Sequence, residues 1–459
     1  MNNSGYLSRR KLLEMAMAVP AVLSASAKAM ADSPERPVAN ATARGKPVMG
    51  LVKPKMKKVR FGVIGLGERG GALVPLLLRV EGAEIVAVCD IYAPALEKSA
   101  NLINKTTGKR VATYTGSEEA YRKLVERGDV DAVIIATPWE WHVPMALHSM
   151  AAGKETFVEV PAAMTIEDCW ALVEASETHQ VNCMMMENCC YGRSEMMVLN
   201  MVRAGLLGDL THGEAAYIHN LRYKLKDFIG EGKWRPEWST KRLANTYPTH
   251  GLGPVAQYMG INRGDRFDYM VSMSSPSHAL VAYAEREFPP DSYRRKQKFI
   301  QGDMNTSIIQ TALGRTIMLQ HDVATPRQYS RLNLIQGSKG TFAGYPDRIA
   351  IDHGEQEFEW TSDLSAFKGT YDSALWKDLE HQLTANPDAH GGMDFVMLWR
   401  IVYCLRNGIA LDQNVYDAAA WSAPADLSEQ SVRDRSRPRD FPDFTRGLWK
   451  TTPALVISA

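Results

Sequence analysis

The stretch 59–90 constrains the fold of this chain more than any other. Residues 59–64 are mostly apolar and β-branched, which predicts a buried parallel strand. Three glycines at the spacing G-x-G-x-x-G follow, namely Gly65, Gly67 and Gly70. Apolar residues then recur at helical period, and a second apolar strand, 84–89, ends at Asp90. The order strand, glycine turn, helix, strand and acid predicts a βαβ unit that binds a dinucleotide.

Each part of this unit has a role in such a site. Gly65 permits the tight turn, Gly67 lets the backbone approach a pyrophosphate, and Gly70 lets helix and strand pack closely. The helix N-terminus offers N–H groups to the phosphates. Asp90 lies twenty residues after Gly70, where a carboxylate accepts both ribose hydroxyls, and no arginine follows it directly. This pattern favours NAD over NADP. The alternative is a glycine-rich loop in an ordinary α/β domain.

The same alternation of strands and helices continues beyond Asp90. Strands are expected at 113–115, 130–137, 156–161 and 181–186, with helices between them. Polar and aromatic residues follow two of these strands, in the sequences PWEWH and ENCCY, and strand 156–161 ends in the polar turn EVP. Open parallel sheets bind ligands at the carboxyl ends of their strands, so we expect these segments to lie over the cofactor. The sequence predicts a doubly wound parallel sheet over 58–190.

The motif ATP-x-x-x-H, followed by a helix, Gly-Lys and a Glu-x-Pro turn, resembles the Gfo/Idh/MocA oxidoreductases. The resemblance implies an α/β protein with two domains, an N-terminal Rossmann domain and a C-terminal α/β domain built on a large, mainly antiparallel sheet. The turn departs from the family pattern, because Val160 stands where the family usually has a lysine that helps to move a hydroxyl proton. A plain sugar dehydrogenase that uses this lysine is therefore disfavoured.

A narrower resemblance rests on TPWEWH, VEVPAA, ENCCYGR, NTYPTHGLGP and HGGMDF. These motifs, in this order, resemble the NAD-dependent α-N-acetylgalactosaminidases, a glycoside hydrolase branch of the same superfamily. The resemblance implies NAD contacts at Glu68, Arg69, Asp90, Trp139, Glu140, Trp141, His142, Glu159, Val160 and Asn188. It implies sugar contacts at Tyr217, Arg235, Tyr247, Pro248, Thr249, His250 and Tyr329.

Nothing in the sequence indicates the pair of carboxylates that a conventional glycosidase needs. The resemblance implies a different chemistry: NAD⁺ takes hydride from C3 of the sugar, the C2 proton becomes acidic, the C1 substituent is eliminated, and water addition and reduction complete the cycle. His250 is the first candidate base, because neutral histidine is a good base near pH 7. Tyr191 is the second, since strand 181–186 directs it toward the nicotinamide. The alternative for His250 is a hydrogen-bonded loop former.

The second domain is expected over 191–424, followed by a charged tail, 425–459, that wraps over the surface. Strand 211–219 is expected to direct Glu214 and Tyr217 into a cavity. A long aromatic loop, 220–250, suits a carbohydrate, because tryptophan and tyrosine rings stack on sugar faces. Its tryptophans have an alternative role in packing the domain interface.

The N-terminus is typical of an exported protein. Residues 1–31 contain Ser8-Arg9-Arg10, an apolar run and a small-x-small cleavage site, which predicts a twin-arginine signal peptide, the translocase as a partner and a periplasmic or secreted location. The alternative is a basic start before a disordered stretch. Residues 32–57 are expected to form a linker.

Composition narrows the partners. The net charge of +1 gives no indication of nucleic acid, and no later stretch is apolar enough to form a stable membrane anchor. The six cysteines have no C-x-x-C spacing, so no metal site is expected. A homo-oligomer stays open as a further partner. Two rival functions stay open, a periplasmic NAD-dependent sugar oxidoreductase and a non-catalytic NAD-binding protein.

Overall fold

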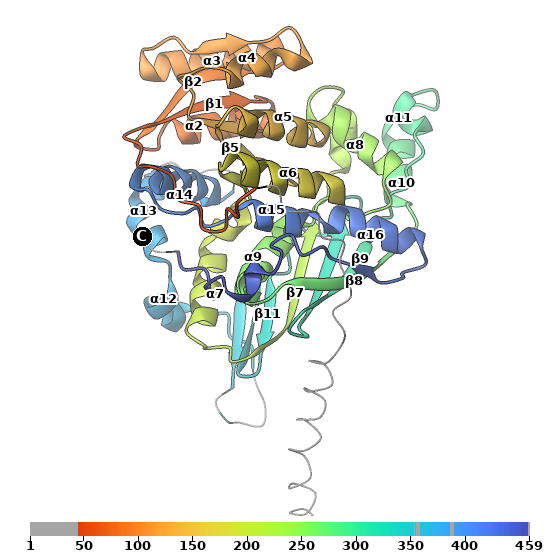
Figure 1. The fold of residues 1–459 in the computed structure, drawn as a ribbon. Helices are drawn as coiled ribbons and strands as arrows, with labels where there is room; N and C mark the ends of the chain where they lie inside the picture. The colour runs from red at the N-terminus through yellow and green to blue at the C-terminus, as the bar shows by residue number, and fades with distance from the viewer. Residues whose placement is uncertain (1–44, 353, 355–358, 386–389, 458–459) are drawn as a thin grey trace, which may run out of the picture. The chain divides into compact units, whose positions relative to one another are not determined.

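Two sheets from successive parts of the chain organise the fold (Figure 1). The computed structural model describes residues 45–352, 354, 359–385 and 390–457, which belong to one compact unit. The predicted signal peptide and the first half of the linker, 32–44, lie outside the described residues. No helix of the described chain has the length and apolar character needed to cross a bilayer.

The first sheet has six parallel strands in the order β3-β2-β1-β4-β5-β6. The order reverses between β1 and β4, and a ligand site is expected at such a switch point. Helix α2, Glu68–Leu77, starts after β1, and helix α5, Trp139–Ala151, starts after β4. The predicted Rossmann sheet is confirmed. Its strands are β1 Val59–Ile64, β2 Ala83–Cys89, β3 Ala112–Tyr114, β4 Ala132–Ile135, β5 Glu155–Val158 and β6 Cys183–Met185. Its other helices are α3 Ala93–Thr107, α4 Tyr121–Val125 and α6 Ile166–His179, with the 3-10 turns η1 Glu118–Ala120 and η2 Asn188–Tyr191.

The second sheet has eight strands in the order β13-β12-β11-β7-β10-β9-β8-β14. Among the described strands of this sheet, only β7 and β10 pair in parallel, so the predicted, mainly antiparallel sheet is also confirmed. Its strands are β7 Leu210–Ile218, β8 Phe267–Ser274, β9 Asn305–Thr311, β10 Thr316–Asp322, β11 Leu334–Gly337, β12 Gly340–Ala343, β13 Arg348–Ile351 and β14 Arg439–Asp440. The helices of this part are α7 Arg193–Arg203, α8 Glu231–Lys241, α9 Thr249–Met259, α10 Ala279–Glu287, α11 Tyr293–Lys296, α12 Ser365–Tyr371, α13 Ala374–Ala385, α14 Met393–Asn407, α15 Val415–Ser422 and α16 Pro424–Arg433, with the 3-10 turns η3 Arg222–Lys226 and η4 Leu448–Lys450.

Helix α9 lies directly on β7, and this close approach positions the site. A β-carbon at Gly251 would lie 2.3 Å from the backbone nitrogen of Ala216, so only glycine fits there. Helices α14 and α15 pack on the first domain, since α14 contacts α2 and β1, and α15 contacts α6 and β6 (Figure 1). Helix α15 also contacts α9, which lies on β7 of the second sheet. Trp421, on α15, is 1% exposed and lies in the continuous core.

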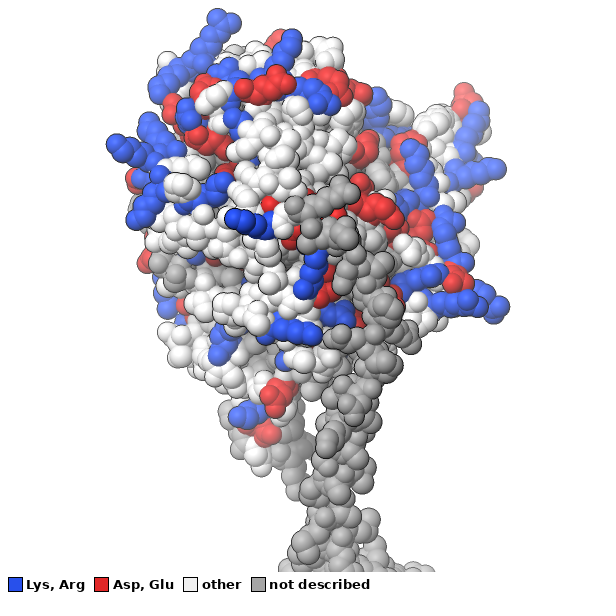
Figure 2. All heavy atoms as spheres, in the orientation of Figure 1, with Lys and Arg blue, Asp and Glu red and all other residues white. Residues whose placement is uncertain are grey.

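Two expectations for the second part are wrong. The stretch 220–250 is not one long loop, because it contains η3, α8 and the start of α9. The tail does not only wrap over the surface: α16 packs on β8, β14 extends the sheet, and Phe441 and Phe444 are buried. On the face drawn in Figure 2, basic and acidic side chains of the described residues are interspersed, in keeping with the net charge of +1.

Candidate active site

A cavity of about 780 Å³ reaches from the switch point of the first sheet to strand β7 of the second. Its walls include Gly65 and Asp90 at one end and Tyr217, Tyr247 and His250 at the other. The cavity therefore joins the predicted dinucleotide site to the predicted sugar site. Of the predicted cofactor residues, it is lined by Gly65, Gly67, Glu68, Arg69, Asp90, Trp139, Glu140, Trp141, His142, Glu159, Val160 and Asn188.

The glycine turn has the geometry that its spacing predicts. Gly65 has φ +85°, and a β-carbon at Gly70 would lie 1.8 Å from the Gly65 carbonyl oxygen, so both positions require glycine. Gly67 caps α2, and among the described atoms nothing beyond its chain neighbours lies within 4 Å of where its β-carbon would stand. A pyrophosphate has room to approach the N–H groups of α2 at this point. The residues therefore fit a dinucleotide.

Asp90 lies at the end of β2, where the ribose of such a nucleotide is bound. One carboxylate oxygen accepts a hydrogen bond from the Leu66 N–H, and the other accepts one from the Tyr92 N–H at 2.7 Å. Each oxygen keeps a lone pair that a ribose hydroxyl can use. The carboxylate thus fixes the turn and remains an acceptor for the cofactor.

Arg69 connects the first domain to a residue that the sequence analysis missed. Its Nε donates to Glu159 Oε1 at 2.7 Å, and its terminal nitrogens donate to both oxygens of Asp394 at 2.7 and 2.8 Å. Asn188 Nδ2 and His390 Nδ1 lie 2.7 and 2.6 Å from the same carboxylate. Burial raises the pKa of Asp394, but Arg69 outweighs it and holds that pKa well below its usual range. The Arg69 guanidinium is therefore held by the carboxylates of Glu159 and Asp394. Because Asp394 belongs to the HGGMDF motif, this motif links the two domains beside the cavity.

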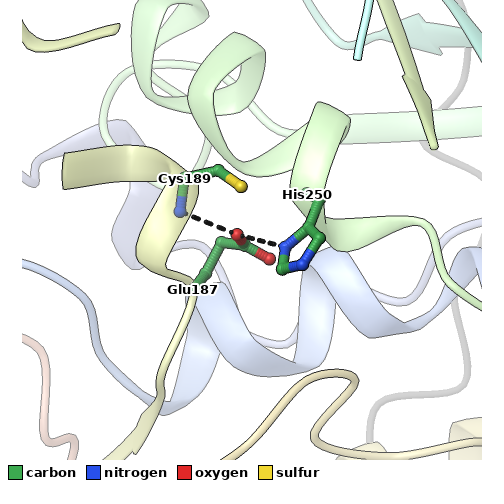
Figure 3. Close-up of side chains that lie close together, drawn as sticks. All are labelled: Glu187, Cys189 and His250. Atoms are coloured by element: carbon green, nitrogen blue, oxygen red, sulfur yellow. Dashed lines mark hydrogen bonds and ion pairs between the residues drawn. The ribbon is translucent and has the colours of Figure 1, made fainter. Parts of the chain in front are cut away.

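His250 and Glu187 form a hydrogen-bonded pair at the sugar end (Figure 3). His250 Nδ1 lies 2.7 Å from Glu187 Oε1, which also accepts the Cys189 N–H at 3.1 Å. Glu187 is fully buried; burial raises its pKa, but His250 outweighs that effect and lowers it, so the carboxylate is ionised at neutral pH. The charged carboxylate accepts the proton on Nδ1, which leaves Nε2 as the basic nitrogen of His250.

Glu187, the Cys189 thiol and His250 also lie within 4.8 Å of one another, a grouping that could hold a metal. A separation of 2.7 Å between Nδ1 and Oε1 is a direct hydrogen bond, whereas two ligands of one zinc ion stand farther apart. Burial also raises the pKa of the Cys189 thiol well above its usual value, which disfavours the thiolate ligand. As arranged, the group is an acid–base pair.

A second acid–base pair lies at the end of β7, where Tyr217 is the penultimate residue and His219 directly follows the strand. The Tyr217 hydroxyl is 2.8 Å from His219 Nδ1, and both residues line the cavity. Burial, reinforced by Arg235, lowers the pKa of His219 to about 4, so this histidine is neutral at pH 7 and accepts a hydrogen bond from the tyrosine hydroxyl. His219 is not among the predicted site residues, although it stands two residues after Tyr217, a spacing that places both side chains on one side of extended backbone. Glu214 stands three residues before Tyr217, so its side chain points to the opposite face of the strand and does not line the cavity. The prediction that Glu214 faces the cavity is therefore wrong.

Arg235 lies against the aromatic wall of this end. Its guanidinium is 4.7 Å from the Tyr247 ring centre and 5.3 Å from the Trp139 ring, and it forms an ion pair with Glu231. Trp234 and Trp238 contact Trp139 at ring-centre distances of 5.1 and 5.5 Å, so these two tryptophans also pack the interface.

The prediction that Tyr191 is a catalytic base is contradicted by its position. Tyr191 is 1% exposed, does not line the cavity, and donates its hydroxyl to Asp412 at 3.3 Å, because the turn η2 directs the side chain into the core. Pro248 and Thr249 do not line the cavity either; they form the start of α9. Tyr329 lies just outside it, with its ring 5.0 Å from that of His219.

His142 lines the cavity but is fully occupied by the backbone. Its Nδ1 lies 2.8 Å from the Pro161 carbonyl oxygen and its Nε2 lies 2.9 Å from that of Thr137. Burial lowers the pKa of this histidine, although the two carbonyls oppose that effect. His142 therefore ties together the two loops that border the switch point.

Two known families match the two parts of the chain. The profile described as "Oxidoreductase family, NAD-binding Rossmann fold" matches residues 59–187. The profile described as "Glycosyl hydrolase 109, C-terminal domain" matches residues 191–451.

Similar proteins agree with this division. A glycosyl hydrolase family 109 protein 1 of Shewanella sp. (strain ANA-3) is 53% identical over 465 residues, covering 99% of each chain. A family 109 protein of Shewanella baltica (strain OS195) is 53% identical over 462 residues, covering 98% of this chain and 99% of its own. Among solved structures, an NAD-binding oxidoreductase from Klebsiella pneumoniae has a TM-score of 0.65 at 15% identity, covering 84% of this chain and 99% of its own. A levoglucosan dehydrogenase in complex with NADH has a TM-score of 0.62 at 15% identity, with the same coverage. The prediction of NAD as cofactor is confirmed.

Proposed function

The chain belongs to glycosyl hydrolase family 109 and carries an NAD-binding Rossmann domain, so it is an NAD-dependent glycosidase, and we propose that it removes terminal α-linked N-acetylgalactosamine. The motif resemblance given above supports this sugar. The single observation that carries the proposal is the continuous cavity, since it brings the dinucleotide turn and two acid–base pairs into one space. Its aromatic and cationic walls suit a polyhydroxylated ring.

The cofactor and the protein divide the work. When bound, NAD supplies a reversible oxidation at C3 of the sugar, which makes the C2 proton acidic enough for the C1 substituent to be eliminated. The glycine turn and the N-terminus of α2 hold the pyrophosphate, and Asp90 holds the ribose. The side chains must then move two protons, one from the C3 hydroxyl and one from C2.

His250 moves the first of these protons. Its Nε2 takes the proton of the C3 hydroxyl, while Glu187 holds Nδ1 and stabilises the positive charge that the ring acquires. Glu187 is fully buried, so water does not screen this stabilisation. Val160 stands where the superfamily usually has its proton-moving lysine, which leaves this role to His250.

The Tyr217–His219 pair holds the sugar beside His250. Burial raises the pKa of Tyr217 well above its usual value, and Arg235, with its guanidinium 5.9 Å from the ring centre, only partly offsets this effect, so the hydroxyl stays protonated. Tyr217 donates a hydrogen bond of 2.8 Å to neutral His219, and the pair is therefore a polar contact for the sugar and not a base at rest.

An aryl α-N-acetylgalactosaminide tests the proposal directly. Purified protein should release the aryl group over many turnovers with no net increase in absorbance at 340 nm, because the cofactor returns to its oxidised form. Stoichiometric NADH would instead identify a sugar oxidoreductase. No aryl release and no NADH, with NAD bound, would favour a non-catalytic NAD-binding protein or another sugar, which a panel of aryl glycosides separates.

We also propose that the chain is exported by the twin-arginine route to the periplasm or beyond. Ser8-Arg9-Arg10 and the cleavage-like site near residue 31 support this proposal. The route carries folded proteins, so the cofactor can be loaded in the cytoplasm before export.

A further inference from the structure

Residues 221–235, which we call the strap, run along the mouth of the cavity. They contain η3 and the first turn of α8, and many of them line the cavity. The strap belongs to the second domain, yet it faces the dinucleotide turn of the first. Three of its apolar side chains are exposed at the mouth: Tyr223 at 49%, Phe228 at 59% and Ile229 at 61%.

One side of the strap is tied to the pyrophosphate-binding turn. Lys224 is only 5% exposed, and its ammonium group forms an ion pair with Glu68, the first residue of α2. The same ammonium lies 3.2 Å from Glu231 Oε2, at the start of α8. Lys224 thus links both ends of the strap to the residue that follows Gly67.

The other side of the strap is tied to the loop after β4. Trp234, on the strap, packs its ring against Trp139, the first residue of α5. Helices α2 and α5 begin on either side of the switch point, where a dinucleotide is bound. The strap therefore bridges both borders of the cofactor groove.

Residues of the second domain hold the strap in its conformation through hydrogen bonds and apolar contacts. Arg294 is 2% exposed and donates to the backbone carbonyls of Asp227 at 3.0 Å and Gly232 at 2.6 Å. Leu225 packs into a second hydrophobic cluster, separate from the main core, with Leu280, Tyr283, Ala284, Phe299 and Ala324. Helix α11 reaches α8 through the Tyr293 hydroxyl, 2.8 Å from Glu237 (Figure 1). The conformation of the strap is therefore fixed by the protein itself.

We propose that the strap retains NAD in the protein between turnovers, and that the Lys224–Glu68 ion pair is its latch. A cofactor that is oxidised again within each cycle has no reason to leave, and an exported protein has no pool from which to replace it. The buried ammonium also offsets the Glu68 carboxylate beside the diphosphate, where two negative charges would repel. This inference rests on the proposed recycling of NAD within each turnover and not on the sugar specificity, so cleavage of a glycoside other than an α-N-acetylgalactosaminide would leave it standing.

The test is the rate at which bound NAD exchanges. Protein purified with NAD is mixed with excess isotopically labelled NAD, separated from free nucleotide at intervals and analysed by mass spectrometry. Lys224→Met should exchange about tenfold faster or more than wild type, since the variant removes the buried ammonium that ties the strap to Glu68, and loss of such a contact acts on the dissociation rate. Lys224→Arg, which keeps the charge, should exchange slowly.

The matched control is Lys226→Met. Lys226 lies on the same 3-10 turn and makes the same kind of contact, an ion pair with Glu287 at 2.6 Å, but it is half exposed and does not line the cavity. Its variant should exchange NAD at the wild-type rate. If Lys224→Met and Lys226→Met exchange equally, the latch is wrong.

A second variant, Glu68→Gln, tests the latch from the first domain, and it provides the test if Lys224→Met fails to fold. Glu68→Gln breaks the same ion pair without changing the strap, and Glu68 is 66% exposed at its side chain, so folding should be kept. Exchange should again be faster. If Glu68→Gln slows exchange, then Glu68 acts only as a charge that repels the diphosphate, and the proposal is overturned.

Discussion

Replacing Glu187 by glutamine tests the proton-transfer pair. The amide keeps the shape of the side chain and can still accept from His250 Nδ1, but it removes the negative charge. Two unit charges about 4 Å apart at an effective dielectric constant near 20 attract by about 4 kcal/mol. The imidazole ring is neutral in the ground state and positively charged in the transition state, so the attraction to Glu187 stabilises mainly the transition state. We therefore expect Glu187→Gln to lower kcat by roughly 10²–10³.

The assay is aryl release under saturating substrate, with bound NAD measured after denaturation of the protein. Glu155→Gln is the matched control: Glu155 is 2% exposed and pairs with Lys53 at 3.2 Å, but it does not line the cavity. This control should keep kcat within about twofold, the range for a buried change outside the chemistry. If Glu187→Gln retains wild-type kcat with NAD bound, Glu187 does not assist His250 and the reasoning is refuted.

Three further predictions concern other parts of the chain. Asp394→Asn should lower the free energy of unfolding at pH 7 by about 3 kcal/mol. Because the pKa of Asp394 is depressed in the folded protein, its contribution to stability is present above the unfolded pKa and is lost in acid, so the difference should shrink as the pH falls below about 4. Urea unfolding of both proteins at neutral and at acid pH measures this difference, and a difference that does not change with pH would contradict the prediction. Tyr191→Phe should keep kcat within about twofold. It should lower the free energy of unfolding by about 1 kcal/mol, measured by urea unfolding, because the hydrogen bond to Asp412 is lost. A hundredfold loss of kcat would instead identify Tyr191 as a base. Arg9→Lys with Arg10→Lys should block export in cell fractionation, and normal periplasmic levels would argue against the signal.

The dinucleotide half of the site could be predicted from the sequence because its chemistry is local. The glycine turn, the helix and Asp90 follow one another within 59–90, and each has a spacing that the geometry requires. The alternation of strands and helices then predicted the parallel sheet, and the family motifs predicted the second sheet.

The interdomain part of the site could not be predicted in this way. Arg69 and Asp394 are 325 residues apart, and only the packing of α14 against α2 brings them together. No local pattern links Lys224 to Glu68, which are 156 residues apart. Contacts of this kind depend on the tertiary fold, which periodicity does not describe.

Three errors had local causes that the sequence did contain. Side chains alternate along β7, so Tyr217 and His219 share a face that Glu214 does not. Tyr191 follows a strand that points toward the cofactor, but the short turn η2 intervenes and reverses its direction. The sequence of helix α8 resembles a loop, because Trp234, Pro236 and Trp238 interrupt the usual apolar spacing.

The most direct test of the central claim is the fate of the hydrogen at C2 during hydrolysis in D₂O. Oxidation at C3 and elimination require that the C2 proton leave and return, whereas a mechanism with two carboxylates never touches it. The released sugar is examined by NMR, and a C2-deuterated substrate is tested in parallel for a rate effect, because the base can shield its proton from solvent. We predict deuterium at C2 of the released sugar. Full retention of the C2 proton, with no rate effect from C2 deuteration, would contradict the account.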